Sequence, residues 1–421
     1  MTETPTRPQP AAATPPEEAD PFEVFNRHQG QGVVIDPYPE WAELRRKSPV
    51  HRLSIMEMMG REGPAMPGMS SEVYMPLTFD GVTEVLRDGQ TFSSSGYART
   101  MGLVMGHTIL EMDEPEHSRY RGLIQRAFTR KSLQRWEREL VRPLIRQRVS
   151  AIRAAGQGDL IRELTFPFPV AVIAGMIGLP EEEHAAFHRL AVELIMIAYD
   201  PPLGMRASQS LKEMFGRLLE KRRAEPTDDL TSVLAHAELD DIRLDDEAIF
   251  AFLRLLAPAG AETTYRSSSN LLYGLLHDPE QLEALARDRR LIPQAIEEGL
   301  RWECPLTTIM RTTTRDVELE GVAIPSKCTV GVNMGAANRD PARWEEPDRF
   351  DILRPQRPHV AFALGPHTCM GMHLARMETR VLLEELLDAL PGLRLGDDAE
   401  DAPITGLTFR SPGRLLVQFD P

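Results

Sequence analysis

Between about residues 131 and 303, apolar residues recur at helical spacing, and this long run constrains the fold more than any other feature. Proline, glycine and acidic turns divide most of it into segments that each predict a helix. These segments are 181–200, 205–224, 228–238, 245–276 and 279–289. Because 245–276 far exceeds the usual three turns, we expect that helix to cross the core.

Strand-like runs are short and lie near the two ends of the chain. They are Val50–Leu53, Val73–Met75, 317–322, 329–333 and 415–419. No linker divides the chain, so we expect one mainly α-helical domain over 21–421, with small sheets that pair early and late strands. Residues 1–20 are rich in proline and small residues and are expected to form a disordered tail.

Charge and cysteine content exclude several classes of protein. The 421 residues include 63 acids and 48 bases, and the net charge of −15 argues against a nucleic-acid-binding protein. An odd set of three cysteines excludes a disulfide framework and fits a reducing cytosol. No apolar run approaches the roughly 20 residues that span a bilayer, and the N-terminus lacks a signal peptide pattern. We therefore expect a soluble cytoplasmic protein.

The segment FALGPHTCMG at 362–371 carries the most specific chemical signal. It is a loop, punctuated by Gly365 and Gly371, that leads into an amphipathic helix. Cys369 would face unpaired backbone N–H groups there, which lower the pKa of a thiol and favour a thiolate. A thiolate suits a soft metal centre. A buried, inert cysteine is the alternative, and is the interpretation for Cys304 and Cys328.

The pattern Phe-x-x-Gly-x-His-x-Cys-x-Gly resembles the haem-binding loop of the cytochrome P450 family. The resemblance implies haem b (iron protoporphyrin IX) with Cys369 as its axial ligand and with Phe362 and His367 in the same loop. It also implies the fold of that family and its activity, insertion of one atom of dioxygen into a small molecule. Ala363 stands where the family usually has glycine.

Glu298 and Arg301 lie three residues apart in AIEEGLRWECP, on one helix face. Alone, such a pair is a weak signal, because exposed helix pairs are common. Its place about 70 residues before Cys369 makes it look like the buried Glu-x-x-Arg pair of the family, which supports the haem loop. Arg349 and Arg354 both qualify as the third member of this network, and the sequence does not decide between them.

The segment AGAETT at 259–264 lies in the middle of the long expected helix and is preceded by Pro258. These residues are poor helix formers, and such violations are expected at functional sites. A kinked core helix is the alternative interpretation. The resemblance implies an oxygen-binding groove, where an opened helix admits water, Gly260 lies at the cofactor, Thr263 hydrogen-bonds the bound oxygen and Glu262 relays protons from solvent.

Haem carries two carboxylates, which need cationic partners. His117 and Arg121 are one turn apart in EHSRYRG and share a helix face. They look like propionate contacts of the family, Arg311 resembles a third and His367 a fourth. Each residue alone would be interpreted as an ordinary surface group.

No flavin, nicotinamide or iron–sulfur motif occurs in the sequence, so electrons must come from a separate protein. The resemblance implies an iron–sulfur ferredoxin with its reductase. From His117 to Arg135 the chain holds six bases and no acid. A solvated basic helix face is the alternative to a docking surface for an acidic partner. The expected docking residues are Arg119, Arg126, Arg130 and Lys131.

The substrate pocket is weakly encoded, and its candidates come from positions where the family touches its substrate. Ordinary core packing is the alternative for each. If they do line the pocket, the substrate is a lipophilic terpenoid, steroid, fatty acid or polyketide, hydroxylated or epoxidised. The candidates are Phe92, Tyr97, Met101, Leu103, Met105, Leu194, Ile197, Leu256, Leu306, Ile309 and Phe409.

Two other functions remain as alternatives. One is a non-catalytic haem or gas-binding protein, and the other is a haem-thiolate peroxygenase or isomerase. The Glu262–Thr263 pair disfavours a gas-binding module, which needs no proton relay, and a peroxide-driven enzyme, which can dispense with it. A requirement for dioxygen separates the monooxygenase from the peroxygenase or isomerase.

Overall fold

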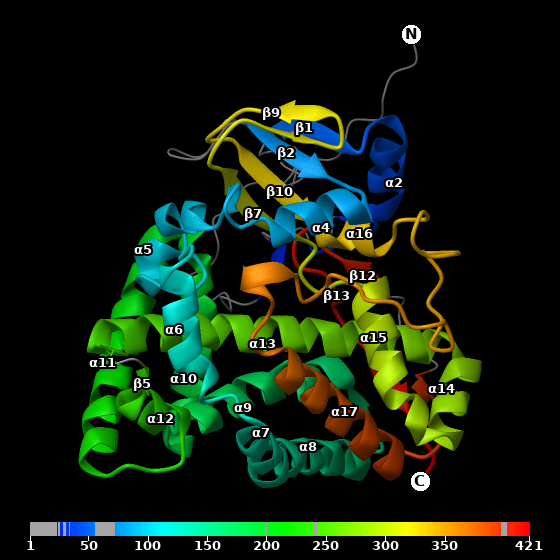
Figure 1. Cartoon of the computed structure of the whole chain (residues 1–421). Helices are drawn as coiled ribbons and strands as arrows, with labels where there is room; N and C mark the ends of the chain where they lie inside the picture. The colour runs from blue at the N-terminus through cyan, green and yellow to red at the C-terminus, as the bar shows by residue number, and fades with distance from the viewer. Residues whose placement is uncertain are drawn as a thin grey trace.

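The computed structural model describes residues 23, 26–27, 31–32, 34–54, 72–198, 200–239, 242–396 and 402–421. The tail expected at residues 1–20 lies outside this part of the chain. The described residues form a mass of helices with a small sheet along one edge (Figure 1). This architecture confirms the expected mainly α fold with small sheets at its margin.

The helical elements follow one another along most of the chain. The helices are α2 (Tyr38–Lys47), α4 (Phe79–Arg87), α5 (Gly102–Met105), α6 (Glu116–Gln125), α7 (Arg130–Trp136), α8 (Arg142–Ala155), α9 (Pro167–Ile177), α10 (His184–Ile195), α11 (Pro201–Ala224), α12 (Leu230–His236), α13 (Asp246–His277), α14 (Pro279–Arg287), α15 (Ile292–Trp302), α16 (Met334–Asn338) and α17 (Met372–Ala389). Single turns include η1 (Ser95–Arg99), η2 (Glu137–Val141), η3 (Ile161–Thr165) and η7 (Gly365–His367).

Helix α13 crosses the middle of the molecule, as its length predicts (Figure 1). It is 32 residues long and starts after Asp245, whose carboxylate caps the helix by accepting the N–H of Ala248 at 2.7 Å. Helices α9, α10, α11, α15 and α17 all contact it. Pro258 does not interrupt the helix.

The main sheet joins strands from both ends of the chain, as predicted. Its order is β1 (Val50–Ser54), β2 (Glu72–Pro76), β10 (Thr329–Asn333), β7 (Thr308–Thr313) and β3 (Phe92–Ser93). β2 runs parallel to β10, with Val73 opposite Thr329, and the other neighbours are antiparallel. β7 follows α15 in the chain, and α4 contacts both β10 and the η7 turn of the Cys369 loop, which places the sheet near that loop (Figure 1).

The prediction of a single strand at 317–322 is wrong. The segment forms the hairpin of β8 (Val317–Leu319) and β9 (Val322–Ile324), which turns at Glu320 and Gly321, both with positive φ. The remaining strands are β4 (Gln157–Asp159), β5 (Glu238–Leu239), β6 (Ile242–Arg243), β11 (Arg394–Leu395), β12 (Ile404–Thr405), β13 (Ser411–Pro412) and β14 (Leu416–Gln418). No described helix is long and apolar enough to cross a membrane.

Candidate active site

The Cys369 loop is a tight loop that contains the turn η7 and leads into helix α17. The N–H of Cys369 donates to the carbonyl of Phe362 at 2.8 Å, and the N–H of Thr368 donates to Gly365 at 3.1 Å. These bonds close the loop upon itself, and the Cys369 residue remains accessible to solvent. The loop lies between the main sheet and α13, with η7 on the sheet side (Figure 1).

Two residues of this loop adopt positive φ angles. Gly365 has a φ of 73°, and a Cβ at this position would lie 2.4 Å from the carbonyl oxygen of Leu86 in α4. Only glycine therefore fits between the loop and that helix. Ala363, where the family usually has glycine, has a φ of 55°. A left-handed conformation at an L-residue costs roughly 1–2 kcal/mol, so the loop keeps its shape despite this cost.

Neighbouring groups shift the pKa of the Cys369 thiol in opposite directions. Although the residue as a whole is exposed, protein atoms surround its sulfur; this local desolvation is the largest influence, and it raises the pKa above the ordinary value. The N–H groups of Gly371 and Met372 and the guanidinium groups of Arg121 and Arg376 lower it. The predicted backbone N–H groups at the helix N-terminus do face the Cys369 thiol. The predicted net lowering of its pKa is wrong for the protein atoms alone, because burial outweighs these groups.

The four expected propionate contacts come together beside the loop. The rings of His117 (α6) and His367 (η7) lie 4.2 Å apart, and Arg121, one turn after His117, donates to the carbonyl of Thr368 at 2.6 Å. Arg311 is buried on β7. Burial and the charges of Arg311, His117 and Arg121 lower the pKa of His367 to about 3, which keeps its ring neutral.

This cluster fits the two carboxylates of a haem. It concentrates two guanidinium groups and two histidines. Two acids lie near it: Glu114 contacts Nδ1 of His117 at 3.1 Å, and the charge of Asp113 acts on Arg311. Nε2 of His117 is buried and has no hydrogen-bond partner within the described residues. A buried, unpaired polar atom is costly, so this position calls for an external hydrogen-bonding group. The residues present therefore match haem propionates.

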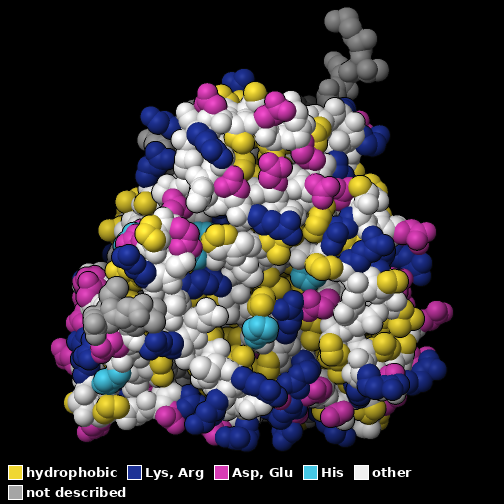
Figure 2. Space-filling view, in the orientation of Figure 1, with side chains coloured by type: hydrophobic (Ala, Val, Ile, Leu, Met, Phe, Trp, Pro, Cys, Tyr) yellow, Lys and Arg dark blue, Asp and Glu magenta, His cyan; other side chains and the backbone are white. Residues whose placement is uncertain are grey.

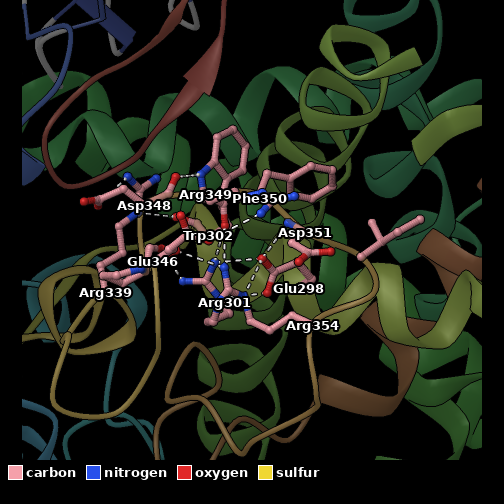
Figure 3. A network of polar contacts seen from close by, with 12 residues as sticks. Glu298, Arg301, Trp302, Arg339, Glu346, Asp348, Arg349, Phe350, Asp351 and Arg354 are labelled. Carbon is pink, nitrogen blue, oxygen red and sulfur yellow. Dashed lines mark hydrogen bonds and ion pairs between the residues drawn. The ribbon is translucent and has the colours of Figure 1, made fainter. Parts of the chain in front are cut away.

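Glu298 and Arg301 form a buried ion pair on α15 (Figure 3). Arg301 donates to Glu298 through Nε at 2.8 Å and through Nη2 at 2.7 Å. It also reaches the carbonyls of Asn338, Pro347 and Arg349, which fixes the segment between β10 and the Cys369 loop.

Arg354 completes this network, which answers the question that the sequence leaves open. Its Nε lies 3.4 Å from the Glu298 carboxylate, and its Nη2 donates to the carbonyls of both Glu346 and Arg349 (Figure 3). The side chain of Arg349 instead turns to Glu346 at the surface, at 3.3 Å. The expected buried triad is thus Glu298, Arg301 and Arg354.

The expected oxygen groove lies on one accessible stripe of α13. Ala259, Gly260 and Thr263 have accessible surface, whereas Ala261, Glu262 and Thr264 are buried. The Thr263 hydroxyl donates to the carbonyl of Ala259 at 2.9 Å. The expected opening of the helix is wrong, because α13 continues through Pro258. Proline has no backbone N–H, so this residue donates no hydrogen bond within the helix.

Gly260 has a packing role that the sequence did not indicate. A Cβ at Gly260 would lie 2.7 Å from Cδ1 of Ile173 in α9, so this glycine lets α9 and α13 pack closely.

Glu262, the expected proton relay, is buried and paired with an arginine. Arg266, one turn later on α13, donates to its Oε1 through Nε at 2.7 Å and also through Nη2. Arg266 is fully buried and further binds Ser411 at 2.9 Å and Asn26. The acid of the expected relay is therefore held inside the protein by an ion pair, and protons from solvent need an intermediate group to reach it.

Several expected substrate residues belong to the core instead. Phe92, Met105 and Leu194 are buried almost completely in the apolar clusters, and Leu256 is buried beside Gly260. They are candidates because the family touches its substrate at these positions. In this structure, packing against neighbouring elements covers the surfaces of the first three, so these three residues do not line a pocket.

The accessible candidates include two neighbouring pairs. Leu306 and Phe409 form a β-bridge, and the hydroxyl of Tyr97 accepts the N–H of Met310, which places Tyr97 next to Ile309. Met101 and Ile197 are half-buried against the main core, and Leu103 is exposed.

Glu378 on α17 is a buried acid that the sequence did not single out. It is 1% exposed, and its Oε1 has no hydrogen-bond partner within the described residues. Burial raises the pKa of its carboxyl to about 8, and a hydrogen bond from Thr264 of α13 opposes that rise. A glutamate on an amphipathic helix ordinarily indicates an exposed face, so only the packing of α17 on α13 shows this burial.

Glu378 makes stability depend on pH. Its pKa is about 8 in the folded chain and ordinarily 4.5, so folding retains a proton and its contribution weakens as pH rises from 4.5 to 8. We expect Glu378→Gln to flatten this slope and to stabilise the protein at pH 9 by on the order of 3 kcal/mol. Urea unfolding across pH measures this. The control is Asp388→Asn on the exposed end of the same helix, and equal slopes in both variants and the parent would contradict the prediction.

Comparison with known proteins agrees with this geometry. Residues 202–391 match the family model described as Cytochrome P450. The chain is 35% identical to the cytochrome P450 monooxygenase PikC of Streptomyces venezuelae, covering 87% of this chain and 86% of that protein. It is 33% identical to a steroid C26-monooxygenase of Mycobacterium tuberculosis, covering 79% of this chain and 91% of that protein.

A solved structure gives the same result. CYP109E1 from Bacillus megaterium, in complex with testosterone, aligns with a TM-score of 0.81 and 31% identity, covering 92% of this chain and all of that chain (100%). The chain therefore belongs to the cytochrome P450 family. It is a P450 monooxygenase, and its cofactor is haem bound through a cysteine thiolate.

Proposed function

We propose that Cys369 is the haem ligand and that the enzyme oxidises a lipophilic small molecule, such as a steroid. The observation that carries the proposal is the closed Phe362–Cys369 loop beside the unpaired Nε2 of His117. When bound, haem supplies the activation of dioxygen for insertion of one oxygen atom. A steroid is favoured because one relative is a steroid C26-monooxygenase and a neighbouring structure contains testosterone.

Three groups of residues would hold the haem: one binds the propionates, one fixes the Cys369 loop, and one supports the segment before that loop. His117, Arg121 and Arg311 supply hydrogen bonds and positive charge for the propionates, and His367 stays neutral among them. Phe362 fixes the loop through its carbonyl, and its ring lies 4.6 Å from the guanidinium of Arg376 on α17. The Glu298–Arg301–Arg354 network holds the segment that precedes the loop.

Substrate would meet the accessible apolar pairs near β7. Leu306, Ile309 and Phe409 offer apolar surface, and Tyr97 is tied to the same strand through its hydroxyl. Hydroxylation and epoxidation both fit such an apolar surface, because it would bind a substrate by shape and apolar contact rather than by charge.

Thr263 and Glu262 are the proposed hydroxyl and acid of proton delivery on α13. Removing the hydroxyl should break the path along which a proton arrives, so electrons would end in peroxide or water instead of product. We expect Thr263→Ala to lower the product formed per electron several-fold, and Glu262→Gln to slow turnover. Thr379→Ala is the matched control, because Thr379 makes the same 2.9 Å bond to a carbonyl one turn earlier. Unchanged coupling in Thr263→Ala would contradict the relay.

A basic face beside the Cys369 loop is the proposed docking surface for a ferredoxin. Arg119, Arg126, Arg130 and Lys131 are exposed on α6, α7 and their connection. Of the other two bases in this segment, Arg121 turns inward and Arg135 pairs with Asp228 at 3.0 Å. Figure 2 shows Lys and Arg side chains gathered over the lower part of this face, where Figure 1 places α7, α8 and α17.

Charge reversal tests this docking surface. Complementary charge raises association rates and is screened by salt over a distance of about 10 Å at 0.1 M. We expect Arg130→Glu with Lys131→Glu to raise the ferredoxin concentration for half-maximal reduction about tenfold at low salt, and much less at high salt. Arg46→Glu on α2 is the control, because that arginine is exposed far from the loop. Equal effects of both substitutions would contradict the assignment.

A further inference from the structure

A small cavity connects α10 to the acid of the proposed relay. It has a volume of about 10 Å³, is partly open, and is lined by α9, α10, α13 and Phe166, which precedes α9. This is about the smallest space that holds one water molecule. Apart from His188, Glu262 and Tyr265, its lining residues are apolar.

The three polar residues differ in what they offer to the cavity. The Tyr265 hydroxyl lies 3.2 Å from Oγ of Ser411, and burial raises the pKa of this tyrosine, so it stays neutral. Both hydrogen bonds from Arg266 end on Oε1 of Glu262. No described residue donates to Oε2, which leaves this oxygen for a water in the cavity.

His188 is the remaining group that exchanges protons near neutral pH. It is half-buried on α10, with its ring centroid 4.9 Å from that of Phe166, so it has both a solvent side and a cavity side. α9 contributes no titratable group to the lining, and α13 contributes only Glu262 and Tyr265, with Arg266 behind Glu262.

We propose that His188 is the residue through which protons enter the relay, passing them by one cavity water to Oε2 of Glu262. This inference rests on the proposed role of Glu262 and Thr263. The imidazolium of His188 donates a proton to the water, the water donates one to the carboxylate, and solvent protonates the imidazole again. The neutral carboxyl then loses its charge attraction to Arg266, which frees it to turn toward the stripe that holds Thr263.

Histidine-selective NMR on the diamagnetic reduced CO complex tests the link without turnover. A carboxylate joined through water favours the imidazolium, so we expect Glu262→Gln to lower the pKa of His188 by about half a unit. Thr263→Ala should leave it unchanged. An unaltered His188 titration in Glu262→Gln would overturn the proposal.

The pH profile of coupling supplies the second test. We expect the product formed per electron by the parent enzyme to fall as pH rises through the titration of His188. In His188→Gln it should be lower and independent of pH in that range. His184→Gln is the matched control one turn earlier on α10, since His184 contacts the carbonyl of Leu179 and does not line the cavity.

The outcomes separate the two proposals. If Thr263→Ala and Glu262→Gln both leave coupling unchanged, the relay itself fails. If they uncouple the enzyme but His188→Gln keeps the parent pH profile, only the entry through His188 is overturned. The reduced CO spectrum of each variant shows that its haem site is intact.

Discussion

Cys369→Ala is expected to abolish the CO absorption band that gives the family its name, together with all monooxygenase turnover. The band requires a thiolate opposite the bound CO, and alanine provides no ligand. The described part of the chain offers no second thiol at this site. Cys304 is fully buried, and burial raises its pKa to about 12, while Cys328 lies beside Thr313, directly before the start of β10.

Cys328→Ala is the matched control for this experiment. Cys328 is half-buried and away from the loop, so its removal should leave the CO band and the haem content unchanged. Circular dichroism checks that both variants fold. A Cys369→Ala protein that keeps the parental band, or a Cys328→Ala protein that loses it, would contradict the assignment of the ligand.

Arg301→Ala is expected to destabilise the protein by about 3–5 kcal/mol, because it leaves Glu298 buried with its main partner removed. The arginine is 3% exposed and its guanidinium ties α15 to three backbone carbonyls as well as to the glutamate. Loss of these contacts should also loosen the segment before the Cys369 loop. We therefore expect weaker haem retention as well as a lower midpoint in urea unfolding.

Arg287→Ala on α14 is the control for Arg301→Ala. Arg287 also pairs with a glutamate on its own helix, Glu283, at 3.0 Å, but both side chains are largely exposed. Exposed pairs contribute roughly 0–1 kcal/mol, so this variant should unfold close to the parent. A similar loss of stability in both variants would show that burial does not determine the strength of the α15 pair.

The Glu298 network shows which parts of the site could be predicted from the sequence and which could not. Glu298 and Arg301 are close because a helix brings residues three apart together, and this local rule is visible in the sequence. The choice between Arg349 and Arg354 is different, since both lie in an irregular segment. Which side chain turns inward depends on tertiary packing, and there Arg354 reaches the carboxylate while Arg349 remains at the surface.

The same distinction holds for the fold: elements determined by local signals could be predicted, and others could not. α13 could be predicted because its cap at Asp245 and its apolar pattern are local signals. The hairpin of β8 and β9 was missed because a short apolar run does not reveal a turn at Glu320 and Gly321.

Burial is the property that sequence patterns predicted least well. Glu378 lies on an amphipathic helix yet is enclosed by α13, and Phe92 matches a family substrate position yet packs into the sheet. Glu262 is expected to relay protons from solvent, and the sequence does not show that it is paired with the buried Arg266. In each case the partner comes from packing that periodicity does not encode.

Turnover with isotopically labelled dioxygen tests the monooxygenase account most directly. The holoenzyme would be combined with an iron–sulfur ferredoxin, its reductase and NADPH. The substrate would be one that shifts the haem absorption by displacing the water ligand, with testosterone as the first probe. The account predicts product carrying one labelled oxygen atom and no product without dioxygen. Product that forms without dioxygen, or that carries oxygen from water or added peroxide instead, would contradict it.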